Sequence, residues 1–242
     1  MINKMKRTVL IIQARMGSKR LPGKSMVYLC GKPLIGHILE RLELVRNVDE
    51  IVLATSELHE NDPIANYAHD NNFKFFRGSE NDLLDRYYQC ALEYNADTVL
   101  RLPADNVCPE PFAYEMLIAY HHLSGNDFSS NICSFMGQTW PDGIGVEAIE
   151  FAALEQAWKN NYDLDKREHV TLNFYDYIND KLPENSQFKV GTIACPSSIS
   201  RPDIVLDVNT AHDLETMRKL YNDLYPQNKY FSIYDIIQWF DK

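Results

Sequence analysis

The segment from Thr8 to Lys24, TVLIIQARMGSKRLPGK, most constrains what this chain can fold into. Val9–Ile12 is a short apolar run, which predicts a buried strand. The loop that follows combines glycine and proline with four cations: Arg15, Gly17, Lys19, Arg20, Pro22, Gly23 and Lys24. Glycine lets backbone N–H groups approach phosphate oxygens, and the cations neutralise them. The segment therefore predicts a polyphosphate-binding loop, although its spacing matches neither a Walker A motif nor G-x-G-x-x-G.

The charge distribution also indicates an anion site near the N-terminus. Residues 1–24 contain seven lysines and arginines and no acid, whereas the whole chain has a formal net charge of −10. A chain this acidic is a poor candidate for binding nucleic acid or an anionic membrane, so we expect a small anionic ligand. We interpret Lys4, Lys6 and Arg7 as a solvated basic terminus rather than as part of the site.

The composition indicates a globular protein with reduced thiols. A hydrophobic content of 45% is ample for a core. No apolar run approaches the ~20 residues of a membrane span, and no signal peptide is recognisable, so we expect no membrane association. The five cysteines are widely spaced with no C-x-x-C, which predicts a cytoplasmic protein without a disulfide framework.

The first half of the chain alternates strand and helix patterns. Strands are predicted at 9–13, 50–55, 73–76 and 98–102, and helices at 33–45, 62–70, 82–94 and 110–123. Such alternation predicts an α/β fold with a doubly wound, mostly parallel sheet and helices on both faces. Ligands of such folds bind at the carboxyl ends of the strands.

The pattern is looser after about residue 125. Strands are predicted at 127–134, 145–149, 188–194 and 204–208, and helices at 151–158, 166–178, 210–224 and 232–240. No repeat or linker divides the chain. We therefore expect a single domain over residues 1–242, with a lid-like subregion at about 130–200.

Two aspartates follow predicted strands and indicate a metal site. Asp105 comes just after strand 98–102, and Asp207 lies at the end of strand 204–208. Mg²⁺ usually takes one or two carboxylates plus phosphate oxygens, so the pair could hold one Mg²⁺ against a bound polyphosphate. The alternative is that each acid caps a turn or a helix.

Two further clusters carry polar side chains suited to a second substrate. Asp142 and Glu147 occur in PDGIGVEAIEF, and Arg167 and His169 occur in KREHVT. Arginine offers a bidentate donor to carboxylate or phosphate, and histidine can donate to hydroxyls. The alternative for the second cluster is an exposed helix start.

The motifs taken together resemble the SpsF-type cytidylyltransferases of surface-polysaccharide biosynthesis, relatives of the CMP-acylneuraminate and CMP-Kdo synthetases. IIQARMGSKRLPGK is similar to the family's nucleotide loop. Further similar segments run in order along the chain: LATS (53–56), FRGSENDLLDRYYQCA (76–91), RLPADNVCPEP (101–111), DGIGVEAI (142–149), REHVT (167–171) and LDVNTAHDL (206–214).

The resemblance implies a Rossmann-like mixed sheet with a dimerising subregion, and hence a homodimer. It implies transfer of CMP from CTP to an acidic sugar or related acid, with release of pyrophosphate and with Mg²⁺ as cofactor. The implied roles are catalysis by Arg15, Lys24 and Asp105; nucleotide binding by Arg15, Gly17, Ser18, Arg20, Lys24, Ser79, Asp82 and Arg86; metal binding by Asp105, Asp207 and Asn209; and acceptor binding by Asp142, Glu147, Arg167 and His169.

The chain departs from the family pattern around the metal and the acceptor. Pro103-Ala104 stands where Thr-Gly is usual, and Asn106-Val107 stands where Cys-Pro is usual. Asn209 replaces an aspartate, and an amide is a weaker ligand for a hard cation than a carboxylate. Gly145 stands where an acid is common. We expect nucleotide binding to be retained and the acceptor to be unusual.

Two other hypotheses remain open from the sequence. In the first, the acceptor is a phosphorylated sugar or small phosphorylated alcohol, or the base is not cytosine. In the second, the protein binds a nucleotide without turnover, and Asn209 reflects lost chemistry. Fold alone does not decide between them.

Overall fold

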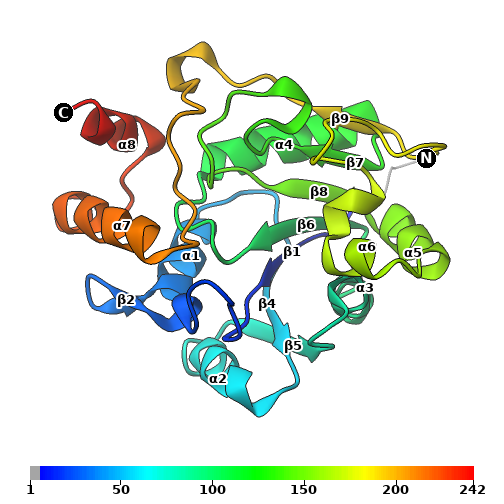
Figure 1. The fold of residues 1–242 in the computed structure, drawn as a ribbon, viewed down its shortest axis with the longest axis horizontal. Helices are drawn as coiled ribbons and strands as arrows, with labels where there is room; N and C mark the ends of the chain where they lie inside the picture. Colours follow the sequence, from blue (N-terminus) through cyan, green and yellow to red (C-terminus); the bar gives the residue numbers. More distant parts are fainter. Residues whose placement is uncertain (1–5) are drawn as a thin grey trace.

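The computed structural model describes residues 6–242, so Lys4 of the basic N-terminal segment lies outside the described residues. Its main sheet has seven strands in the order β5-β4-β1-β6-β8-β7-β9 (Figure 1). The strands are β1 (Thr8–Gln13), β4 (Glu50–Ser56), β5 (Lys74–Gly78), β6 (Thr98–Pro103), β7 (Phe128–Ser130), β8 (Glu147–Glu150) and β9 (Val190–Thr192). Only β8 runs antiparallel to its neighbours. This confirms the predicted α/β fold with a mostly parallel sheet.

Strand β1 lies inside the parallel half of the sheet. It pairs with β4 on one side and β6 on the other, and Val9–Ile12 are fully buried. A strand covered on both faces needs a continuous apolar run, which explains the sequence pattern. Because β1 and β6 are adjacent, the loop after Gln13 and the turn after Pro103 leave the same edge of the sheet.

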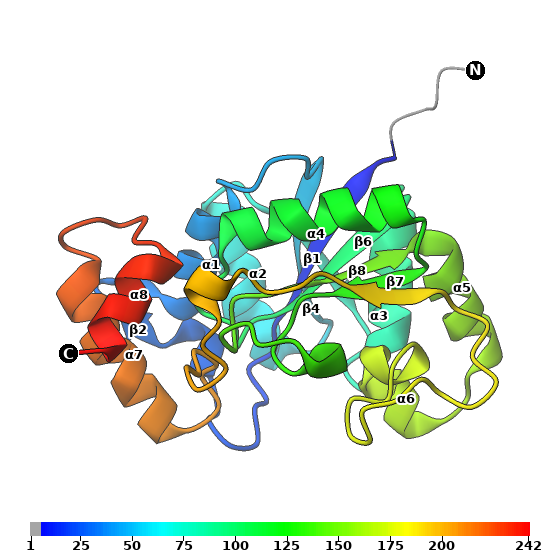
Figure 2. The same cartoon turned by 90° about the horizontal axis from the view of Figure 1, so that it is seen from above.

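Helices cover both faces of the sheet, as predicted. They are α1 (Leu34–Leu42), α2 (Asp62–Asp70), α3 (Leu83–Glu93), α4 (Pro111–Ser124), α5 (Phe151–Asn160), α6 (Leu164–Glu168), α7 (Ala211–Leu224) and α8 (Ile233–Phe240). Apolar side chains of α1, α2, α4, α7 and α8 share one core, and those of α3 and α5 share another. Figure 2 shows α4 along one side of the sheet and α3 along the other. No helix within residues 6–242 is long and apolar enough to cross a bilayer.

Short elements complete the fold. A two-stranded hairpin consists of β2 (Tyr28–Leu29) and β3 (Lys32–Pro33). The 3₁₀ turns are η1 (Lys24–Met26), η2 (His59–Asn61), η3 (Phe135–Gly137), η4 (Val170–Asn173) and η5 (Ser197–Ile199).

The prediction of a helix over 166–178 was wrong. Helix α6 ends at Glu168, and the chain continues as the turn η4. The Asn173 amide explains the break, because its Nδ2 donates to the carbonyls of Lys166 and Val170, both at 2.9 Å. Such side-chain bonds to the backbone compete with continued helix.

Two strand predictions were also wrong. One strand is shorter than predicted, and the other segment does not form a strand. Strand 127–134 ends at Ser130, because Asn131 turns its side chain to the backbone N–H of Val146 at 2.9 Å. Segment 204–208 forms only isolated bridges, one with Asp142 and one with Asn106. Every second residue of the segment is buried, as in a strand. The segment nevertheless bridges the turns that carry Asp142 and Asn106 and does not pair along a neighbouring strand.

Candidate functional site

Two adjoining cavities open at the carboxyl ends of β1 and β6. The first cavity, of about 380 Å³, is lined by residues after β1, by the turn before α3 and by α6. The second cavity, of about 410 Å³, is lined by the turn after β6, the approach to β8 and segment 204–208. Arg101 and His169 line both cavities, so the two share a wall. A doubly wound sheet is expected to bind ligands at this edge.

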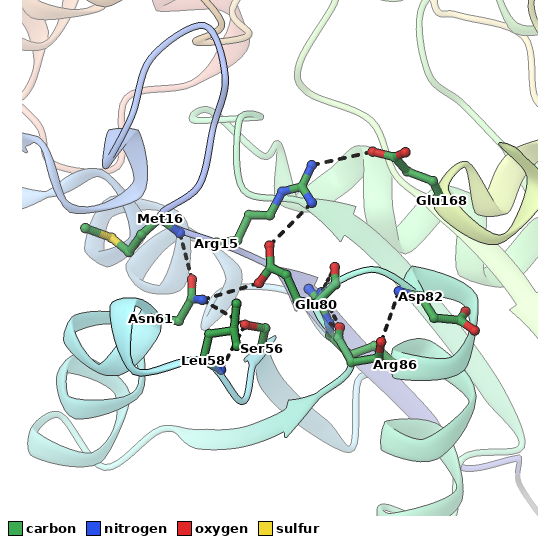
Figure 3. Close-up of polar contacts among 10 residues, drawn as sticks. Arg15, Met16, Ser56, Leu58, Asn61, Glu80, Asp82, Arg86 and Glu168 are labelled. Atoms are coloured by element: carbon green, nitrogen blue, oxygen red, sulfur yellow. Dashed lines mark hydrogen bonds and ion pairs between the residues drawn. The ribbon is translucent and has the colours of Figure 1, made fainter. Parts of the chain in front are cut away.

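Arg15 is the most exposed of the three arginines that line the first cavity (Figure 3). Its Nη1 lies 3.6 Å from Glu80 and its Nη2 lies 3.6 Å from Glu168, and its side chain is 39% exposed. These separations exceed ordinary hydrogen-bond lengths, so the two acids hold Arg15 loosely. A phosphate group entering the cavity can therefore pair with Arg15 without breaking a tight bond.

Asn61 anchors the start of the loop and was missed by the sequence analysis. Its Oδ1 accepts from the N–H of Met16 at 2.8 Å, and its Nδ2 donates to Ser56 at 2.8 Å and to Glu80 at 3.4 Å (Figure 3). The side chain is fully buried. It fixes the direction in which the chain leaves β1. No local motif marks this role, because the partners come from three separate segments.

The other loop residues predicted to bind nucleotide do not line the first cavity. Ser18 Oγ accepts from the N–H of Leu21 at 3.3 Å and so closes the loop on itself. A Cβ at Gly17 would lie 3.3 Å from Glu60 Oε1, which indicates close packing. Arg20 lines the second cavity instead, where its Nη2 donates to Asn209 Oδ1 at 2.8 Å.

Lys24 links the loop to the turn after β6. Its Nζ donates to Asp105 Oδ2 at 3.2 Å, to the carbonyl of Val208 at 2.8 Å and to Asn209 Oδ1 at 3.2 Å. The ammonium thus lies among three oxygen atoms at the boundary of the second cavity. This places the predicted cation and the predicted metal ligand in direct contact.

Among the residues before and within α3, some line the first cavity and others hold neighbouring elements in place. Arg86 lines the first cavity but is only 2% exposed, and its guanidinium donates to the Ser79 carbonyl at 2.8 and 2.6 Å. Burial lowers the pKa of Arg86. Asp82 caps α3 and accepts from Arg167 Nε at 2.6 Å. Neither Asp82 nor Arg167 lines a cavity. In this structure Arg167 ties α6 to α3, and its contact with the acceptor stays a prediction.

Asp105, Asp142 and Asp207 form a group that we call the acid cluster. Segment 204–208 brings it together: the N–H of Val208 donates to the Asp105 carbonyl at 3.0 Å, and the N–H of Leu206 donates to the Asp142 carbonyl at 3.0 Å. Gly143 permits the approach, since it has φ +87° and a Cβ there would lie 2.7 Å from Asp207 Oδ1.

The electrostatics of the acid cluster favour a cation. Burial and the nearby charges of Asp142 and Asp105 raise the pKa of Asp207 to about 8. Burial and Asp105 also raise the pKa of Asp142. With its amide nitrogen facing the acids, Asn106 donates to Asp105 Oδ1 at 3.3 Å and to Asp207 Oδ1 at 3.0 Å. Carboxylate oxygens are the hard ligands that Mg²⁺ takes in proteins.

The described residues form no closed metal site made of protein side chains alone. Within residues 6–242, no group of three or more His, Cys, Asp or Glu side chains is arranged to hold a metal ion by itself. Mg²⁺ commonly takes only one or two carboxylates and completes its shell with phosphate oxygens and water.

Glu147 is held in place by two neighbours in the second cavity. Arg101 Nη1 donates to its Oε2 at 2.6 Å, and the Thr171 hydroxyl donates to its Oε1 at 2.6 Å. His169 approaches the hydroxyl of Tyr177 at 3.4 Å. Arg101, Thr171 and Tyr177 were not predicted as site residues. The available signals were a charge inside the apolar strand TVLRLP and the place of Arg101 and Thr171 in segments that resemble the family.

Gly145 has no room for a side chain. A Cβ there would lie 2.6 Å from the carbonyl oxygen of Asn131, which is itself buried. The acid expected at this position from the resemblance therefore does not fit this backbone. This accounts physically for one departure noted in the sequence.

A cationic loop, an acid cluster and two adjoining cavities thus lie at one edge of the sheet. A family model described as cytidylyltransferase matches residues 9–235. This chain belongs to the cytidylyltransferase family. It is 33% identical over 226 residues to an uncharacterised protein of Methanocaldococcus jannaschii, covering 93% of this chain and 85% of that protein.

A second relative and a solved structure agree with this membership. The chain is 27% identical over 220 residues to the spore coat polysaccharide biosynthesis protein SpsF of Bacillus subtilis, covering 88% of this chain and 85% of that protein. The structure of a cytidylyltransferase from Leptospira borgpetersenii has a TM-score of 0.85 and 26% identity, over 98% of this chain and 94% of that one.

Proposed function

We propose that this cytidylyltransferase transfers CMP from CTP to an acidic sugar or related acid for surface polysaccharide synthesis. The observation that carries the proposal is the shared wall of the two cavities beside the acid cluster and Lys24. A nucleotide and an acceptor placed in these cavities would meet there. The acidic acceptor is supported by the motif resemblance, and the role in polysaccharide synthesis by the likeness to SpsF, a spore coat polysaccharide biosynthesis protein.

The first cavity would bind the nucleotide. Arg15 would pair with the triphosphate once Glu80 and Glu168 release it. Leu83 and Leu164 line the same cavity and offer apolar contact to a base, and Asn81 offers an amide for hydrogen bonds to the base edge. Lys24 would contact the phosphates near the acid cluster, since a lysine binds phosphate as a compact charge.

The second cavity would bind the acceptor. Arg20 lines it and hydrogen-bonds to the neutral Asn209, so its charge is available for an acceptor carboxylate. Glu147 and His169 would accept from and donate to acceptor hydroxyls. Asp142 lines this cavity, and its raised pKa suits it to take the proton of the attacking hydroxyl.

The reaction proposed is one in-line displacement. An acceptor oxygen bonds to the α-phosphorus of CTP, the bond from that phosphorus to the bridging oxygen breaks, and pyrophosphate leaves with the electron pair. Such transfers depend on positioning and on charge neutralisation more than on covalent catalysis. Mg²⁺, held by Asp105 together with Asp207 or Asn209, would polarise the phosphate and neutralise its charge.

We include a homodimer in the proposal. Large apolar side chains near α6 are strongly exposed, among them Tyr162 and Ile178. They lie in the 130–200 subregion, which we propose contributes both acceptor contacts and the dimer contact within a single domain. Light scattering across protein concentrations would test the oligomeric state.

The experiment for the reaction is pyrophosphate release with CTP, UTP, GTP or ATP and a panel of acidic sugars, phosphorylated sugars and phosphorylated alcohols, each with and without Mg²⁺. We expect release only with CTP, Mg²⁺ and an acidic acceptor. Pyrophosphate release with another triphosphate or with a phosphorylated acceptor would show that the proposed nucleotide or the proposed acceptor is wrong. Stabilisation by CTP against heating without release in any mixture would favour a nucleotide-binding protein without turnover.

A further inference from the structure

Arg101 is a buried cation at the wall shared by the two cavities. It lies in β6 and lines both cavities, and its side chain is only 11% exposed. A charge at this depth needs a reason, because burying a cation is costly even when it is paired. The ion pair with Glu147 at 2.6 Å explains why a buried charge is tolerated, but it does not explain why the charge lies at this position.

The guanidinium is held rigidly. Nη1 donates to Glu147 and also to Thr171 Oγ1 at 3.2 Å, and the group lies 5.7 Å from the centre of the Tyr87 ring. The charge of Glu147 raises the pKa of Arg101 and outweighs burial, so the group stays cationic. An arginine fixed in this way loses little conformational entropy when it forms a further bond.

Two of its nitrogens remain without a partner among the described residues. Nε is buried and forms no hydrogen bond. Nη2 forms none either and is not among the buried unpaired atoms, so it keeps some exposure where Arg101 lines the cavities. The arrangement leaves donors available after Glu147 and Thr171 are satisfied.

Resting on the proposed function, we infer that Arg101 Nη2 donates to a non-bridging oxygen of the α-phosphate of CTP. In that reaction the α-phosphorus is bonded to the nucleoside and also receives the acceptor oxygen. It is therefore the one atom that must lie where the two cavities meet. Of the two side chains shared by both cavities, Arg101 is the permanently charged one, and a fixed donor there would stabilise the charge that develops on the transferred group.

The experiment measures binding, so it does not require the acceptor. Calorimetry with cytidine, CMP, CDP and CTP would compare the native protein, Arg101→Lys, Arg101→Gln and the double variant Arg101→Gln/Glu147→Gln. The double variant leaves no uncompensated buried carboxylate, which protects its folding. The matched control is Arg41→Gln/Glu110→Gln, which removes a buried pair at 3.7 Å in the other core.

We expect the double variant to lose about 10- to 100-fold in affinity for CMP, the range for a hydrogen bond to a charged group. Cytidine, which has no phosphate, should bind as before, and Arg101→Lys should show a smaller loss. The control should leave the ratio of CMP to cytidine affinity unchanged.

Other outcomes separate the two proposals. If the native protein binds CTP but the double variant keeps the native ratio, the Arg101 inference is wrong and the proposed function stands. Equal weakening of cytidine and CMP would show a merely structural role and would also overturn the inference. If the native protein binds none of the four, the proposed function fails as well.

Discussion

The two cavities differ in how far their charges are already satisfied. In the first cavity, Arg15 lies between two acids, and Arg86 is bonded to backbone carbonyls. In the second cavity, Asp142 and Asp207 have no cation paired with them among residues 6–242, and burial raises the pKa of both. The charges of the first cavity, which we call the preformed side, are thus already paired with protein groups, whereas the aspartates of the second cavity, the incomplete side, lack a counter-charge among these residues.

The largest expected effect comes from removing Asp105, which belongs to the incomplete side. We expect Asp105→Ala to lower the rate of pyrophosphate release by about a thousandfold or more, since metal-assisted charge stabilisation contributes several kcal/mol. CTP affinity should fall much less, because Asp105 does not line the first cavity. Rate and calorimetric measurements on one preparation would check both, and near-native turnover would contradict the metal assignment.

A smaller effect is expected from Arg167, which supports the preformed side. Arg167→Ala removes its bonds to Asp82 and to the carbonyls of Trp158 and Asn161, at 2.6, 3.2 and 2.8 Å. We expect the free energy of unfolding to fall by about 1–3 kcal/mol. The KM for CTP should rise more than the KM for the acceptor, because α6 lines the first cavity.

Lys166→Ala on the same helix is the control for Arg167→Ala, since it also shortens a long cationic side chain of α6. Urea unfolding and substrate titrations would be run on both variants. A selective rise in the acceptor KM for Arg167→Ala would instead support the acceptor contact predicted from the sequence.

A pH effect of intermediate size is expected from Asp207. Its pKa is about 8 in the folded protein and ~3.9 in an unfolded chain, so between these values only the folded state keeps the proton. Stability should therefore fall as the pH rises from about 4 to about 8. Asp207→Asn should reduce this dependence, and Asp70→Asn, at an exposed carboxylate, should not. Thermal unfolding between pH 5 and 8.5 would show it, and identical slopes for Asp207→Asn and native protein would refute it.

The smallest effect is expected from Asn209→Asp. Asn209 Oδ1 accepts from Arg20 and Lys24, and a carboxylate can accept the same bonds more strongly. We expect turnover to be retained or raised, with a lower Mg²⁺ concentration needed for half-maximal rate. A large loss of rate would mean that this chain depends on a neutral side chain at the site.

The sequence predicted the secondary structure of β1, the loop after it and the neighbouring helices better than that of segments 166–178 and 204–208, for a physical reason. Val9–Ile12, the loop to Lys24 and the helix starts are local patterns, and α2 matches its predicted range of 62–70. The α7 boundary followed from Thr210 and Asp213, which form a capping box. Such features depend on neighbours in the chain, so periodicity and cap residues reveal them.

The second cavity depends on contacts between distant segments. Ile204, Leu206 and Val208 are buried in alternation and so resemble a strand, but their partners are turns at 105 and 142. No role was predicted for Arg101 from the sequence, because its proposed role follows only from its position between the two cavities. Thr171 was assigned to a helix, yet it lies in the turn that reaches Glu147. No pattern within these stretches of sequence indicates which distant residues they contact.

The position of segment 204–208 has a consequence for how the protein is made. Synthesis runs from the N-terminus, so β1, β4, β5 and β6 are all available before Asp207 leaves the ribosome. Until then the turns carrying Asp105 and Asp142 lack the strand-like segment that joins them. A nascent chain can thus display its cationic loop while its acidic centre is still unassembled, and premature chain termination before residue 204 would leave a fragment with no complete site.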